Sequence, residues 1–174
     1  MPTPLPETTN APIRLEELIN RIAGIIGSDN FPTGERAALR RLHPDPDHPP
    51  SLGFYRFFYR HIEGHWAGQR HLPNWQTLLA GMAIMYPAHH QPGRHVGQAL
   101  AENRYSEARL ERLLDAEPDT QRILLLRAAR FLAAKGEPID WREFAWLLFA
   151  ADDEAREQQR RHIARDFYRH LPKD

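Results

Sequence analysis

The sequence contains no cysteine, and lysine is nearly absent: only Lys135 and Lys173 occur among the 23 basic residues, and the rest are arginines. The lack of thiols excludes disulfide bonds, thiolate metal sites and cysteine nucleophiles. The preference for arginine has two explanations, and the sequence leaves both open. It can reflect a GC-rich genome, or it can serve phosphate recognition, because a planar guanidinium matches phosphate oxygens better than an ammonium group does.

Long apolar segments are missing as well. No apolar run approaches the roughly 18 residues of a membrane span, and the N-terminus, MPTPLPETTNAP, lacks the basic-then-apolar layout of a secretion signal. We therefore expect a cytoplasmic protein that does not contact a membrane. The formal net charge is zero, with 23 acidic and 23 basic side chains, so any anion binding must come from local clusters of charge.

Apolar residues recur at helical spacing along the chain, and no segment alternates as a strand does. The pattern predicts an all-α fold, a compact bundle of about eight or nine helices in one body or in two small lobes. The expected helix N-caps are Thr33, Asn74, Ser106 and Asp140, and Glu143 is expected to complete a capping box with Asp140.

Proline and histidine are concentrated in the first half of the chain. Residues 1–12 contain four prolines and are predicted to form a disordered lead-in. Twelve of the 15 prolines lie at or before Pro92, and eight of the ten histidines lie between His43 and His95. We expect one helical domain over 13–174, with a softer division near residue 92.

No catalytic or metal-binding set stands out. His61 and His65 are four residues apart and His89 precedes His90, but there is no HExxH motif and no carboxylate at ligand spacing. No serine lies in a nucleophile-elbow sequence, and no glycine-rich phosphate loop is present. We therefore expect no enzyme, no metal and no other cofactor.

The stretch GERAALRRLHPD, residues 34–45, carries three arginines. At helical spacing Leu39 marks the buried side, Arg36 and Arg40 flank it, and Arg41 points further away. Such a set is either a solvated helix face or an anion-binding site, and this stretch alone does not decide between the two.

Two further helices carry comparable sets. In the last helix Arg161, Arg165 and Arg169 recur every four residues opposite the apolar stripe, whereas Arg160 is predicted to lie at the stripe's edge and to snorkel or pair with an acid. The apolar helix over 119–135, expected to be central, adds Arg127 and Arg130. If these sets converge, they form a basic groove; if not, each is an ordinary solvated face.

Taken in order, several segments resemble one known family. GERAALRRL, FYRFF, WQTLLAGMA, HVGQALAENRYSEARLERLLDAE, GEPIDWREFAWLLF and RRHIARDFY follow the order and spacing of the CasB family, from about residue 33 onward. CasB is the small subunit of the type I-E CRISPR surveillance complex, Cascade. The ordered set is more specific than any one of its motifs, all of which are helical and rich in leucine and arginine.

The resemblance implies an all-helical, non-catalytic subunit. Its implied partners are the Cascade backbone and large subunits, a second copy of itself, the guide RNA, and the target and displaced DNA strands. Base pairing reads the sequence in such complexes, and phosphate contacts carry no sequence information.

The resemblance also selects arginines. The family's basic positions match Arg40, Arg41, Arg109, Arg130, Arg160 and Arg161. Gln98 stands where many relatives have a basic residue, and Arg94, one turn earlier, is a possible substitute. Together with the residue pattern this gives the candidate nucleic-acid-binding residues Arg36, Arg40, Arg41, Arg94, Arg109, Arg127, Arg130, Arg160, Arg161 and Arg165.

Two other hypotheses compete with this one. A helical protein–protein adaptor would use its arginines only for surface ion pairs and would not bind nucleic acid. A metal-dependent hydrolase would use the histidine-rich loops and would contain stoichiometric metal. The residues alone favour the adaptor over any enzyme.

Overall fold

The computed structural model describes residues 11–45 and 47–173, and these form nine α-helices and two 3₁₀ turns. The helices are α1 (Leu15–Gly27), α2 (Thr33–Arg40), α3 (Leu52–His61), α4 (Leu72–Met85), α5 (Val96–Glu102), α6 (Glu107–Asp115), α7 (Pro118–Lys135), α8 (Trp141–Leu148) and α9 (Asp153–Arg169), with turns at Gly64–Ala67 and Gln69–His71. An isolated bridge between His90 and Ile139 is the only β-type pairing in the described part. The predicted all-α class is confirmed.

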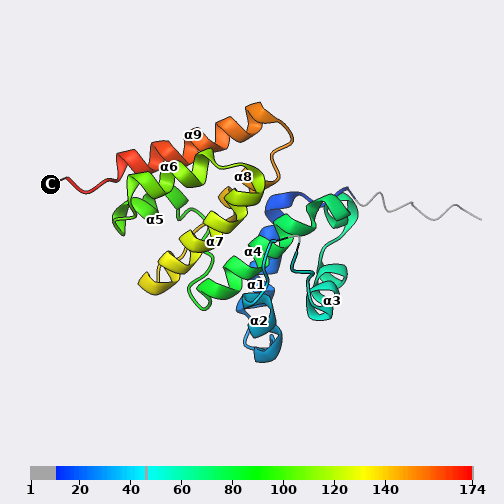
Figure 1. Cartoon of the computed structure of the whole chain (residues 1–174). Helices are drawn as coiled ribbons and strands as arrows, with labels where there is room; N and C mark the ends of the chain where they lie inside the picture. The colour runs from blue at the N-terminus through cyan, green and yellow to red at the C-terminus, as the bar shows by residue number, and fades with distance from the viewer. Residues whose placement is uncertain (1–10, 46, 174) are drawn as a thin grey trace, which may run out of the picture.

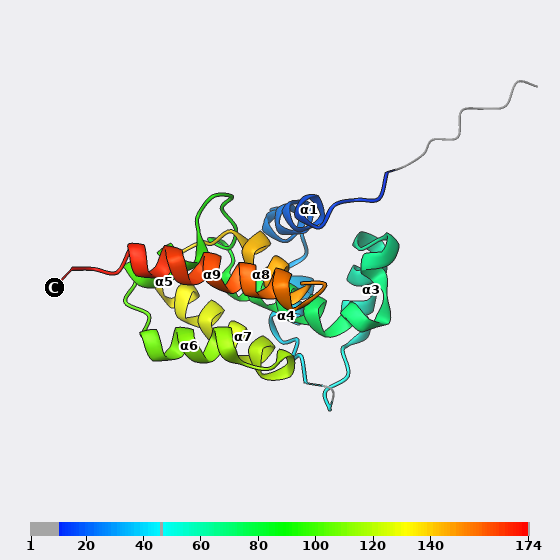
Figure 2. The ribbon, with the colours of Figure 1, turned by 90° about the horizontal axis from the view of Figure 1, so that it is seen from above.

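Helix α4 forms the centre of the fold. Eleven of its 14 residues are buried, so apolar side chains cover it nearly all round. Helix α7 packs along α4, and the two run side by side in both views (Figure 1, Figure 2). Helices α1, α2 and α8 pack against other sides of α4. The sequence predicted that α7 is the central helix. Instead α4 is central, and α7 packs beside it.

Helix α9 lies along the top of the molecule in Figure 1 and packs on α5 and α8. The contact with α5 is close because of Gly97, where a Cβ would overlap the backbone of Ile163 and lie 2.6 Å from the backbone nitrogen of Phe167. Glycine is therefore required for this approach of the two helices.

Two of the four expected N-caps are confirmed and two are wrong. The side chains of Ser106 and Asp140 accept hydrogen bonds from the first turns of α6 and α8. Thr33 is instead the first residue of α2. Asn74 lies inside α4, where its amide donates to the carbonyl of Leu148 at 3.0 Å.

The capping box at α8 is also wrong. The carboxylate of Glu143 does not turn back to its own helix start but accepts a hydrogen bond from the backbone N–H of Val96 at 2.9 Å. Glu143 therefore caps α5 from the neighbouring helix. A sequence pattern cannot distinguish these two uses of a glutamate three residues after an N-cap.

The buried core is continuous from Leu15 to Phe167 and crosses residue 92 without a break. On this ground we propose one domain over 13–174. The predicted lead-in over 1–12 lies outside the described residues except for Ala11 and Pro12, which are exposed. None of the described helices has the length and apolar character needed to cross a membrane.

Candidate nucleic-acid interface

Arg36 is buried, although the sequence placed it on the flank of α2. Its Nε donates to the carbonyl of Ile26 at 3.0 Å and a terminal nitrogen donates to the carbonyl of Ser28 at 3.0 Å. These carbonyls belong to the end of α1 and the residue after it, where backbone acceptors lack helical partners. Because its donors serve the fold, Arg36 is not available to a ligand in this structure.

Arg40 and Arg41, here called the α2 pair, are exposed at the C-terminal end of α2. The Nε of Arg40 donates to the carbonyl of Ala83 at 3.4 Å, which anchors the side chain against α4. Neither guanidinium forms an ion pair with a carboxylate of the described residues. The α2 pair is thus a local cation pair without an internal counter-charge there.

Arg109, Arg127 and Arg130, the α6–α7 group, are exposed on two adjacent helices. The guanidinium carbon of Arg109 lies 6.0 Å from the centre of the Tyr105 ring. Burial raises the pKa of Tyr105, and the charges of Arg109 and Arg127 oppose that increase. Both cations therefore lie near one ring, and no described carboxylate forms an ion pair with any of the three.

Arg94 is committed to carboxylates. It pairs with Glu102 at 2.7 Å and with Glu137, and its side chain is largely covered. Gln98, at the position where the CasB resemblance implies a basic residue, donates to the same Glu102 at 2.8 Å. In this structure Arg94 links α5 to the loop before α8, so it does not replace the missing basic residue as a free cation.

Arg160 is committed in the same way. Its Nε donates to the carbonyl of Leu114 at 2.9 Å at the end of α6, and its terminal nitrogens pair with Asp115 and Glu157. The prediction that Arg160 lies at the edge of the apolar stripe and pairs with an acid is confirmed.

Arg161, Arg165 and Arg169, the α9 line, are exposed along one helix. Arg161 lies 3.8 Å from Glu157, a loose contact at an exposed side chain. Arg165 donates from Nε to Asp166 at 3.1 Å and contacts the Nδ1 atom of His162 at 2.9 Å. The α9 line therefore carries partly compensated charge.

The three groups lie on different helices of the fold. Helix α9 lies along the top of Figure 1 and α2 at the bottom, with α7 at a height between them. The α2 pair and the α9 line thus belong to opposite sides of the molecule. The structure brings together Arg40 with Arg41 and Arg109 with Arg127. Helix α9 contacts α6 through the hydrogen bond that the Tyr168 hydroxyl donates to Glu107 at 2.5 Å, so the α9 line and the α6–α7 group belong to contacting helices.

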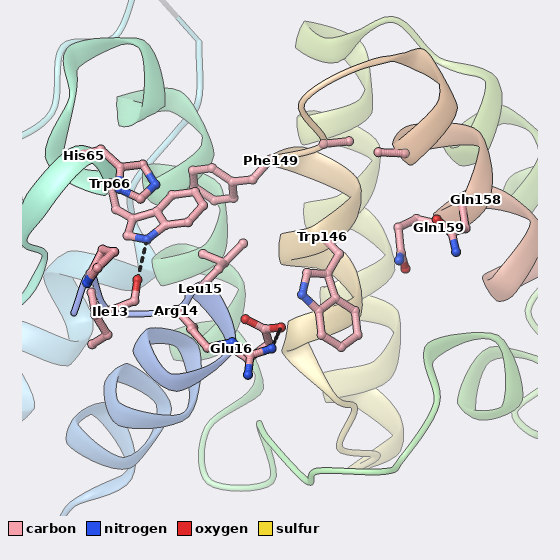
Figure 3. Close-up of a pocket in the computed structure, with 13 residues that line it drawn as sticks. Ile13, Arg14, Leu15, Glu16, His65, Trp66, Trp146, Phe149, Gln158 and Gln159 are labelled. Carbon is pink, nitrogen blue, oxygen red and sulfur yellow. Dashed lines mark hydrogen bonds and ion pairs between the residues drawn. The ribbon is translucent and has the colours of Figure 1, made fainter.

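An apolar cavity of about 590 Å³ lies between α1, α8 and the start of α9 (Figure 3). Leu15, Trp66, Trp146 and Phe149 contribute its walls, and the indole N–H of Trp66 donates to the carbonyl of Ile13 at 3.0 Å. The residues that line it do not bring a serine or threonine hydroxyl next to a base.

The histidines considered for metal binding are used by the fold or lie apart. His89 is buried, with its ring nitrogens contacting the carbonyls of Pro87 at 3.1 Å and Ala23 at 2.8 Å. His90 contacts the side-chain oxygen of Asn20 at 2.8 Å. These two rings join the loop before α5 to α1.

A different histidine cluster, absent from the sequence reasoning, lies between α5, α8 and α9. His95, Glu143, His162 and Asp166 place one ligand-type atom each within 4.8 Å of the others. The hydrogen bond from His95 to Glu143, at 2.5 Å, raises the pKa of His95. Only His162 and Asp166, four residues apart, have a spacing that a sequence pattern can detect.

The model of the family described as CRISPR-associated protein Cse2 matches residues 35–168. The match begins within α2 and ends within α9, so it includes the α2 pair, the α6–α7 group and most of the α9 line. A search of curated proteins gives no match to this chain.

Proposed function

Because the chain belongs to the family of CRISPR-associated protein Cse2, a subunit of the Cascade complex, we propose that it is a non-catalytic subunit that holds nucleic acid through arginines. In this proposal it acts in the cytoplasm, next to the backbone and large subunits and a second copy of itself. It stabilises the guide RNA–target DNA hybrid and the displaced strand.

The exposure of the family-matched arginines supports this proposal. Arg40, Arg41, Arg109 and Arg130 are exposed and form no ion pair with a described carboxylate. A guanidinium without a carboxylate partner can exchange hydration for phosphate contacts without breaking an internal ion pair. The binding energy of such contacts comes largely from counterion release and is sensitive to salt.

The positions of the groups refine the proposal. The α2 pair and the α9 line lie on helices at opposite ends of the view in Figure 1. We assign the α2 pair to one nucleic-acid segment and the α9 line to another, the two segments being the guide–target hybrid and the displaced strand. The α6–α7 group extends the contact between them.

The test uses reconstituted Cascade in which this chain carries charge reversals. We expect Arg40→Glu with Arg41→Glu to shorten the lifetime of the complex on target DNA about tenfold or more at moderate salt. The matched control is Arg56→Glu with Arg60→Glu, which makes the same charge change on exposed positions of α3. Nuclease protection, measured separately on each DNA strand, shows which strand loses its contact.

Two results would decide against the proposal. If both double variants assemble normally and retain both strands as the unmodified protein does, the chain functions as a protein–protein adaptor. If the α3 control weakens DNA retention equally, the effect comes from net charge, and the α2 pair has no specific role.

A further inference from the structure

We propose that His95, Glu143, His162 and Asp166 form a binding site for one divalent transition-metal ion, with Zn²⁺ as the preferred occupant. The site uses no arginine as a ligand, although Arg165 of the α9 line contacts His162 and Asp166. It would join three helices: its ligands come from the residue before α5, from the buried face of α8 and from two successive turns of α9.

The donor distances suit a small ion. The His162 Nε2 atom lies 3.4 Å from an oxygen of Glu143 and 3.4 Å from Oδ2 of Asp166, and His95 Nδ1 lies 3.7 Å from the same Oδ2. Zinc–nitrogen and zinc–oxygen bonds of about 2.0–2.2 Å place tetrahedral ligands roughly 3.3–3.6 Å apart. The two 3.4 Å separations fall in this range and the 3.7 Å separation lies just above it. The 2.5 Å hydrogen bond between His95 and Glu143 must open for an ion to enter.

The strongest sign of a missing partner is Oδ2 of Asp166. The side chain of Asp166 is only 8% exposed, and this oxygen has no hydrogen-bond partner among the described residues. Its neighbours are the donor atoms of His95 and His162. A buried carboxylate oxygen without a partner is unfavourable, and a cation at this position would satisfy it.

The donor set also fits the chemistry of zinc. Two imidazoles and two carboxylates give four nitrogen and oxygen ligands, and the two negative charges neutralise a divalent ion. Glu143 is held by its second oxygen, which accepts from the backbone of Val96 at 2.9 Å. Such an outer contact orients a ligand before the metal arrives.

An ion can reach this site from solvent. The side chains of His95 and His162 are 43% and 30% exposed, whereas Glu143 and Asp166 lie deeper. A cavity of about 570 Å³ opens beside His162 and is lined by α9 residues that include Arg161 and Arg165. The ring nitrogens therefore stand at the entrance and the carboxylates at the bottom.

Arg165 opposes metal binding. Its guanidinium contacts Nδ1 of His162 at 2.9 Å, whereas a neutral imidazole that binds metal through Nε2 carries its proton on Nδ1. The arginine must therefore turn away from Nδ1 when the ion binds, keeping its contact with Oδ1 of Asp166. Removing Arg165 should strengthen metal binding, an effect opposite to that expected of a residue that merely supports the cluster.

The full chain, stripped with a chelator and dialysed, is titrated with Zn²⁺ against a chromophoric competitor. We expect one Zn²⁺ per chain and a rise in melting temperature on the order of 5 °C with excess metal. Asp166→Asn and His162→Asn should each weaken binding at least tenfold, and Arg165→Gln should tighten it severalfold. Substituting Co²⁺ should give the visible absorption of a four-coordinate ion.

A second histidine cluster provides the matched control. His43, Asp45 and His48 also gather their ligand atoms, but they offer three donors on an exposed loop. His43→Asn with His48→Asn should leave the stoichiometric site intact. The proposal is overturned if the unmodified protein binds no Zn²⁺ at micromolar concentration, if the loop variant removes the bound ion, or if Co²⁺ shows only weak six-coordinate absorption. Circular dichroism of each variant without metal separates lost binding from lost folding.

Discussion

The guanidinium carbon of Arg36 lies 3.7 Å from the centre of the Tyr86 ring. A cation this close to a ring face is held by the ring's quadrupole as well as by its hydrogen bonds. With its donors on the carbonyls of Ile26 and Ser28, Arg36 ties α2 to the end of α1 and to the residue after α4. It is a structural residue on the same helix as the α2 pair.

Arg36→Leu should therefore lower the free energy of unfolding by about 2–3 kcal/mol, because it leaves buried carbonyls without donors. Urea denaturation of the isolated chain measures this loss. The matched control is Arg41→Leu, an exposed position on the same helix end, where the expected change is within about 0.5 kcal/mol. Equal losses in the two variants would contradict a structural role specific to Arg36.

Gly97 offers a test of the α5–α9 contact. Gly97→Ala places a methyl group against the backbone of Ile163 and Phe167, so the helices must separate, at a cost of about 1–3 kcal/mol. Gly24 lies in α1 with open space around its Cβ position, and Gly24→Ala should stabilise by about 0.5–1 kcal/mol. Thermal melts of both variants measure these opposite effects; a Gly97→Ala protein as stable as the unmodified chain would mean that α9 packs less closely on α5.

These residues also show where sequence reasoning succeeds and where it ends. Helical spacing and capping residues predicted the helices because both are local features of the sequence. Ser106, for example, was expected to begin a helix, and it caps α6 in the structure. The same periodicity placed Arg36 beside the buried face but could not show that Tyr86, fifty residues later, would cover it.

The candidate interface was predictable only in part, for the same physical reason. Arg161 and Arg165 were predicted to be exposed because they lie on the face of α9 opposite its apolar stripe, and both are exposed. The pairing of Arg94 with Glu137 and the meeting of His95 with Glu143 depend on how distant helices pack. No local sequence pattern predicts those contacts. The predicted nucleic-acid-binding arginines therefore included some that form internal ion pairs, and the histidine cluster was not predicted.

The carboxyl group of Asp140 should make the stability of the fold depend on pH in the acidic range. Burial raises the pKa of this carboxyl, but the hydrogen bonds from the Arg142 side chain and from the backbone N–H of Gly93 and Arg142 outweigh burial, so its pKa is lowered from 3.8. A lowered pKa in the folded state contributes stability above the unfolded pKa, and that contribution disappears as pH falls through the folded pKa.

Asp140→Asn should therefore destabilise the protein by about 1–3 kcal/mol at pH 7, and the difference from the unmodified chain should shrink below about pH 4. Urea denaturation over a series of pH values measures this convergence. Asp29→Asn is the control, because Asp29 is exposed and should shift stability little at any pH. A constant difference down to pH 2 would show that the charge of Asp140 is not the source of the effect.

Arg160 and Arg161 are adjacent in sequence, but their substitution should have different effects. Substitution of Arg160 should lower stability, and substitution of Arg161 should change the salt dependence of DNA binding. Arg160 donates to the carbonyl of Leu114 and pairs with Asp115 and Glu157, so Arg160→Gln should cost about 1 kcal/mol of stability. Arg161 is 72% exposed with one loose contact, so Arg161→Gln should leave stability unchanged. If Arg161 contacts phosphate, its removal should reduce the slope of log affinity against log salt by about 0.7 for single-stranded DNA.

Fluorescence anisotropy with a labelled single strand, repeated at several salt concentrations, gives both slopes for the isolated chain, and urea denaturation gives both stabilities. Each arginine serves as the control for the other. A general loss of charge or of folding would affect both variants alike, so it cannot lower stability in one variant and the salt slope in the other. A slope reduced equally by both substitutions would show that the ion pairs of Arg160 open on binding, and Arg160 would then rejoin the interface that the family resemblance assigned to it.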